Sequence, residues 1–77
     1  MPTIIVLFDI QIVIHTTEHN PPHVHAFFKG DEALFNILNG EMFRGEIPNK
    51  QAKIVKKFIL AYKDNLLDEW NRLTNHD

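Results

Sequence analysis

The sequence predicts an α+β domain in which a small antiparallel sheet carries one long C-terminal helix packed on one face. Three observations support this fold class. Short runs rich in Ile, Val and Phe fill the first half of the chain. Asn39-Gly40, the strongest short hairpin signal, lies between two of these runs. After Pro48 the apolar residues recur at steps of three and four, which is typical of one helix face.

Four to five strands are predicted, joined in chain order as a meander. Asp9 and Gly30-Asp31 favour turns between successive runs. Asn20-Pro21-Pro22 lacks two backbone N–H donors and therefore predicts a loop between the second and third strands. The predicted strands are Thr3–Phe8, Ile10–His15, His23–Lys29, Glu32–Leu38 and a short one around Glu41–Arg44.

The predicted helix begins near Pro48 or Asn49, which suit the first positions of a helix. Its apolar stripe keeps its phase to about Thr74 without Gly or Pro, so we expect one helix rather than a break near Asp64-Asn65. At 1.5 Å per residue it extends about 38 Å, longer than the roughly 20 Å of a six-residue strand. The stripe consists of Ala52, Val55, Ile59, Tyr62, Leu66, Trp70 and Leu73.

Length and composition restrict the class of protein. The 77 residues predict a single domain over residues 1–77, and 44% hydrophobic and 23% charged residues are ordinary globular values. The absence of Cys excludes disulfides, zinc fingers of Cys type and thiol nucleophiles. No apolar run approaches the ~18 residues of a membrane span and no signal peptide is recognisable, so we expect a cytoplasmic protein. A net charge of −2 and the lack of a helix-turn-helix pair argue against DNA binding.

Strand alternation predicts a second sheet face that the helix does not cover. If Ile10, Ile12 and Ile14 face the helix, His15 faces away from it. A face that meets only solvent carries few apolar side chains, so this mixed face suggests a surface that another molecule covers. The residues assigned to it are His15, His23, His25, Glu32, Val13, Phe27 and Leu34.

The most concentrated group of functional side chains is the segment His19-Asn20-Pro21-Pro22-His23-Val24-His25. His23 and His25 lie two residues apart on a strand, which places both imidazoles on one face, about 7 Å apart at the backbone. The two prolines order the approach, so His19 returns toward this pair at reduced entropic cost.

Three interpretations of these histidines stay open. In the first, His19, His23 and His25, with His15 or Glu18, bind zinc or another divalent metal. In the second, His23 and His25 divide general acid and base roles while Lys29 or a lysine of the predicted helix holds a phosphate. In the third, His23 and His25 only pack and bond to backbone and water.

A second cluster lies at the start of the predicted helix, where Lys50, Lys53 and Lys57 form one stripe. Cations near a helix N-terminus oppose the macrodipole by about 0.3–1 kcal/mol each at low salt. A solvated face is one explanation of these lysines. The other is an anionic partner, either RNA or an acidic protein.

A family resemblance rests on Met1-Pro2-Thr3-Ile4, the His-x-Pro-Pro-His-x-His pattern of residues 19–25 and the Asn39-Gly40-Glu41 turn, followed by Gly45, Pro48, Leu66 and Trp70. Together these segments resemble the bacterial domain-of-unknown-function-4160 family. The resemblance implies a small, cytoplasmic protein whose gene often lies beside that of another small domain, a toxin–antitoxin-like arrangement. It implies a partner more than a reaction. Asp9-Ile10 departs from the pattern, because a glycine is expected in the first hairpin.

The expected function is therefore that of a protein-interaction component in a two-gene, toxin–antitoxin-like system, with a small protein encoded nearby as its partner. Two alternatives from other classes stay open: an RNase-type toxin that uses His23 and His25, and a metal-binding domain built on the His-rich segment. Homo-oligomerisation and RNA binding remain compatible with the sequence. No membrane partner is expected.

Overall fold

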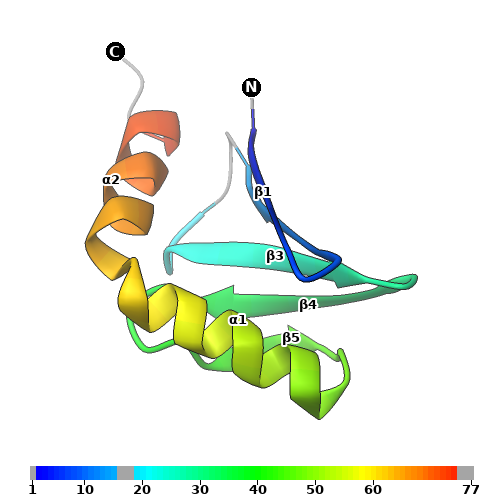
Figure 1. Ribbon diagram of the computed structural model, residues 1–77. Coiled ribbons are helices and arrows are strands. Elements are labelled where there is room, and N and C mark those ends of the chain that lie inside the picture. The colour runs from blue at the N-terminus through cyan, green and yellow to red at the C-terminus, as the bar shows by residue number, and fades with distance from the viewer. Residues whose placement is uncertain (1, 16–18, 75–77) are drawn as a thin grey trace.

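The computed structural model describes residues 2–15 and 19–74, which form five strands and two helices (Figure 1). The strands make one open antiparallel sheet in the order β1-β2-β3-β4-β5, which confirms the α+β class and the predicted meander. No helix in these ranges has the length and apolar character needed to cross a membrane. The elements are β1 (Thr3–Leu7), β2 (Ile10–Ile14), β3 (His23–Phe28), β4 (Asp31–Asn36), β5 (Met42–Gly45), α1 (Asn49–Ala61) and α2 (Lys63–Thr74).

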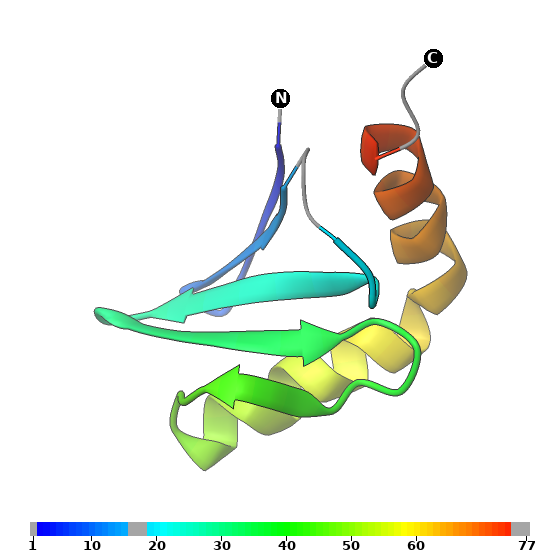
Figure 2. The ribbon, with the colours of Figure 1, turned by 180° about the vertical axis from the view of Figure 1, so that it is seen from behind.

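Both helices lie toward one face of the sheet, and the hydrophobic core forms there (Figures 1 and 2). Strand alternation turns Ile10, Ile12 and Ile14 into this core, where all three are fully buried. Val55 and Ile59 of α1 are fully buried against the same cluster. Each such side chain contributes roughly 1.5–3 kcal/mol relative to an exposed one. The opposite face of the sheet, called the outer face below, has no helix in front of it (Figure 2).

The prediction of one long C-terminal helix is wrong, because the helical region is divided at Tyr62. This residue leaves the helical backbone (φ −117°, ψ 26°), and its carbonyl accepts the Leu66 N–H at 2.9 Å. A straight helix of this length would extend beyond the sheet. The bend instead lets α2 run beside the hairpin of β1 and β2, next to the start of β1 (Figure 1). Leu66, Trp70 and Leu73 of α2 thereby stay in the core, whereas Tyr62 is 52% exposed.

The first hairpin turn contains no glycine although its backbone favours one. Leu7 pairs with Ile10, so Phe8 and Asp9 form a two-residue loop. Both have positive φ, 50° and 65°, as type I′ hairpin turns require. The turn predicted around Asp9 is thus present, and it holds two L-residues in a left-handed region that costs roughly 1–2 kcal/mol per residue.

Replacing this loop by the favoured type I′ sequence, Phe8→Asn with Asp9→Gly, is expected to raise the free energy of unfolding by about 1 kcal/mol. Phe8 is 74% exposed, so removing its ring loses little buried area. Urea unfolding followed by circular dichroism measures the change. An unchanged or lowered stability would show that the left-handed backbone of this turn is not strained.

A polar contact joins the two ends of the described chain. Thr3 Oγ1 of β1 donates to Glu69 Oε2 of α2. Arg72 donates two hydrogen bonds to the same carboxylate, from Nε to Oε1 at 2.9 Å and from Nη2 to Oε2 at 2.5 Å. The hydrogen bond from Arg72 and then that from Thr3 lower the pKa of Glu69 from 4.5 to about 2, because both stabilise the charged carboxylate.

This contact is expected to make the free energy of unfolding depend on pH at low pH. Since the pKa of Glu69 is depressed in the folded state, its contribution is fully present above pH 4.5 and disappears as the pH falls through about 2. Glu69 is a surface residue, so Glu69→Gln is expected to cost only about 0.5–1 kcal/mol at pH 7. The free energies of unfolding of the two proteins, measured by urea titration, should converge as the pH falls below about 2. If the parent and Glu69→Gln differ in free energy of unfolding by the same amount at every pH, the charged carboxylate of Glu69 is not the source of the stabilisation.

Candidate functional site

The outer face carries a row of side chains that crosses all five strands. The strand registers place Val13 opposite His25, His25 opposite Leu34, and Leu34 opposite Arg44. Ile4 of β1 continues the row, because it pairs with Val13. Val13 is only 5% exposed although it lies outside the main core cluster. The predicted mixture of apolar and ionisable side chains on this face is therefore present.

His25 lies in the middle of this row and contacts a carboxylate. Its Nδ1 donates to Glu32 Oε2 of β4 at 2.8 Å, which orients the ring and places the proton on Nδ1. The imidazole of His15 meets His25 edge to face, with ring centroids 4.3 Å apart. The ring of Phe27 lies nearly parallel to that of His25 at 6.3 Å. Side chains of β3 and β4 and the residue that follows β2 thus fix the position of the His25 ring.

His23 occupies a more enclosed place than its neighbour. It is 6% exposed, its ring lies 5.3 Å from that of His25, and its Nδ1 donates to the Pro21 carbonyl at 2.8 Å. The indole of Trp70 reaches it from α2 with a centroid distance of 5.1 Å. His23 therefore contacts both His25 on the outer face and Trp70 of α2.

A groove with a volume of about 410 Å³ opens beside these two histidines. One wall is the loop before β3 and the other is formed by β4 and β5. Its lining combines apolar surface with nitrogen-bearing side chains: His19, Asn20, Pro21, His23, His25, Leu34, Phe43 and Arg44.

Comparison with known proteins places the chain in a family. The family described as Domain of unknown function (DUF4160) matches residues 9–71. The chain belongs to this family. No curated protein and no solved structure matches it. The matched range contains every residue that lines the groove, so the groove lies within the DUF4160 domain.

The metal-binding interpretation stays a prediction. Within residues 2–15 and 19–74 of this DUF4160 chain, no group of three or more His, Cys, Asp or Glu side chains is arranged to hold a metal ion. His19, His23 and His25 all line the groove, and His15 contacts His25. Glu18, the remaining residue of the predicted set, lies outside the described residues.

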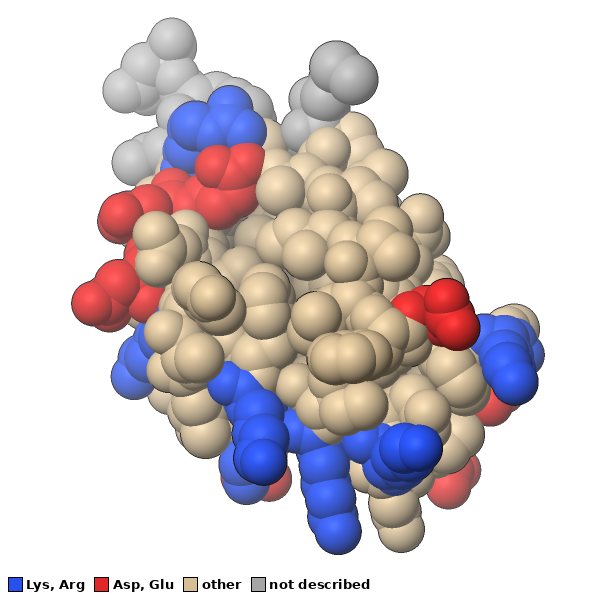
Figure 3. All heavy atoms as spheres, viewed as in Figure 1, with Lys and Arg blue, Asp and Glu red and all other residues tan. Residues whose placement is uncertain are grey.

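The lysine cluster lies away from the groove. Lys50, Lys53 and Lys57 are exposed on α1, which covers the face opposite His25. Figure 3 shows Lys and Arg side chains gathered along the lower edge of the DUF4160 domain, the side on which α1 lies in the same view of Figure 1. A lysine of α1 is therefore not positioned to hold a phosphate beside His23 and His25.

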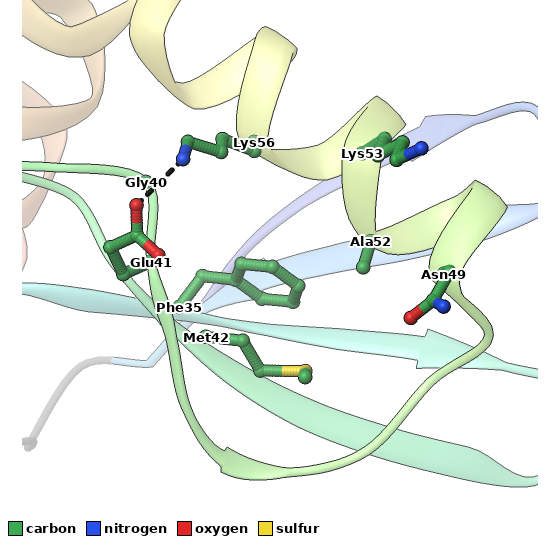
Figure 4. A pocket seen from close by; sticks show the side chains of 8 residues that line it. All are labelled: Phe35, Gly40, Glu41, Met42, Asn49, Ala52, Lys53 and Lys56. Atoms are coloured by element: carbon green, nitrogen blue, oxygen red, sulfur yellow. Dashed lines mark hydrogen bonds and ion pairs between the residues drawn. The ribbon is translucent and has the colours of Figure 1, made fainter.

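A smaller hollow of about 160 Å³ lies between α1 and the β4–β5 loop (Figure 4). Lys56 closes one side of it through an ion pair with Glu41 at 2.6 Å. Phe35 and Met42 lie beneath the helix, and Lys53 stands at the rim (Figure 4). This ion pair within the chain involves Lys56, which lies beside the predicted stripe of Lys50, Lys53 and Lys57 and is not part of it.

The sequence prediction did not assign Phe43 and Arg44 to the site. A β-bulge at Leu34/Phe35 shifts the register of β4 against β5, so alternation in a four-residue strand does not reveal which side chains face outward.

The sequence predicted Glu32 on the outer face, but its contact with His25 depends on the β3–β4 register. That register follows from the two-residue Lys29-Gly30 turn.

Proposed function

We propose that this protein is a protein-interaction component of a two-gene, toxin–antitoxin-like system and that it binds its partner through the groove on the outer face. One observation carries the proposal: the sheet presents a groove lined by apolar side chains, histidines and one arginine on the face that no helix covers. A face of this composition is typical of a surface that a protein partner covers.

The chemistry of the groove indicates which partner segment it accepts. Arg44 is exposed and has no ion-pair partner in the described part of the chain. Leu34 and the 46% exposed ring of Phe43 supply apolar surface next to it. An acidic side chain adjacent to an apolar one in the partner complements both features.

Co-expression with the small protein encoded by the neighbouring gene tests the proposal. We expect the two chains to co-purify, and Arg44→Glu to raise the dissociation constant at least about tenfold, because it replaces attraction by repulsion. The matched control is Lys63→Glu, a charge reversal at the start of α2, outside the groove and outside the predicted lysine stripe, which should bind normally. A chain that ignores the neighbouring protein, or equal losses in both variants, would refute the proposed role.

A histidine-dependent RNase-type toxin is the second candidate, favoured by the hydrogen bond between His25 and Glu32. A carboxylate that fixes the tautomer of a histidine is a common arrangement for general base catalysis, and Arg44 in the same groove offers a cation for phosphate. Expression should then arrest growth, and His25→Ala should relieve the arrest. An alanine variant as toxic as the parent would exclude this candidate.

A further inference from the structure

We infer that β1 pairs with the β1 strand of a second copy of this chain, which joins the two sheets across a two-fold axis. This inference does not depend on the proposed function, because β1 and β5 form opposite edges of the sheet. An edge strand presents unpaired N–H and C=O groups to whatever approaches it. The question is therefore which of the two edges remains open to another strand.

The β5 edge carries several features that discourage pairing. Its four residues include Arg44 and Gly45, Glu46 follows directly, and a bulge interrupts its pairing with β4. Charged side chains, short length and bulges are the means by which proteins protect sheet edges. This edge is therefore unsuited to a further strand.

The β1 edge carries no charge and no bulge, and it is one residue longer than β5. Its sequence, Thr-Ile-Ile-Val-Leu, contains no charged residue, Gly or Pro, and its five consecutive pairs with β2 run without a bulge. Ile4 is 54% and Val6 is 70% exposed. The surface over β1 is correspondingly uncharged in Figure 3. An uncharged, regular and apolar edge strand is the kind that pairs with another strand.

The sequence of β1 also matches itself. Antiparallel pairing centred on Ile5 places Thr3 opposite Leu7 and Ile4 opposite Val6, and the two-fold axis repeats each pair. The side chains that are most exposed on this strand thereby cover one another, and no like charges meet. The pairing needs little reordering, since β2 on one side and Glu69 at its end already fix β1. A second copy of the chain is therefore the occupant that fits this edge.

Analytical ultracentrifugation of the full chain over a wide concentration range tests the inference. We expect a reversible dimer, and Ile4→Lys should raise its dissociation constant about 10- to 30-fold, because two ammonium groups about 7 Å apart enter the interface. Combining Ile4→Lys with Val6→Glu should restore the dimer to within about threefold, since each ammonium group then lies opposite a carboxylate. Leu60→Lys, at a 49% exposed position on α1, is the matched control and should dimerise as the parent does.

Four outcomes would overturn the inference. They are a parent chain that stays monomeric at every concentration, a dimer that Ile4→Lys does not weaken, equal weakening by Leu60→Lys, and failure of the double substitution to restore association. Circular dichroism of each variant shows whether it is folded, and the rescue by the double substitution separates a register-specific contact from a general loss of structure. Strand pairing with a different protein would appear as a monomeric parent.

Discussion

Gly45→Ala is expected to lower the free energy of unfolding by about 3 kcal/mol or more, and urea titration measures this loss. A Cβ atom on Gly45 would lie 2.2 Å from the backbone oxygen of Glu32 and 3.1 Å from Ala33 Cα. Gly45 also has a φ of +72°, in the left-handed region that other residues rarely adopt. Because the obstructing atoms belong to the backbone of β4, relief of the clash requires the β4–β5 ladder to move.

Gly30→Ala separates the two causes of this loss, the steric clash with β4 and the left-handed backbone conformation. Gly30 has a φ of +86°, but a Cβ atom there would meet nothing within 4 Å. It therefore experiences backbone strain alone, which costs about 1 kcal/mol. Similar losses at Gly30 and Gly45 would show that the close approach of β5 to β4 is not a constraint. The same experiment bears on the groove, because Arg44 depends on the ladder that Gly45 permits.

The sheet was predictable because its strands obey a local rule. Alternation identified Ile10, Ile12 and Ile14 as core, and the same rule placed His25 on the opposite face. Turn residues located the loop around Asp9. These features depend on neighbours in sequence and on one buried face, so they are visible without the fold.

The division of the helix was not predictable in the same way. Tyr62 occupies a stripe position, and neither Gly nor Pro marks the bend. Its position follows from the length of the sheet and from the contact of α2 with β1, both of which are tertiary properties. The burial of His23 has the same origin, because only the bend brings Trp70 of α2 onto its ring.

The candidate site was predictable in its histidines but not in its cations. His19, His23 and His25 stand close together in the sequence, and their loop and strand keep them together in space. The lysines of α1 come from a separate element, and the sheet separates them from the groove. The cation that lines the groove is instead Arg44. Its position depends on the bulge that sets the register of β4 against β5, and no local sequence pattern reveals that register.

Trp70→Ala is expected to cost about 3–5 kcal/mol, a large part of the stability of a domain this small. The indole is 4% exposed, belongs to the core cluster and packs on His23, so its removal opens a cavity between α2 and the sheet. If this variant is unfolded at 25 °C, Trp70→Phe keeps the effect measurable, with an expected loss of about 1–2 kcal/mol. Circular dichroism must follow the transition, because Trp70 is the single tryptophan of the chain.

Tyr62→Ala is the matched control, since both aromatic residues occupy the same helical stripe in the sequence. Tyr62 is 52% exposed and its described ring contact is with Phe58 of α1, so its truncation should cost less than about 1 kcal/mol. A single continuous helix would instead bury both rings and make the two losses comparable. The ratio of the two losses therefore measures in solution whether the chain bends at Tyr62, and with it whether α2 reaches His23.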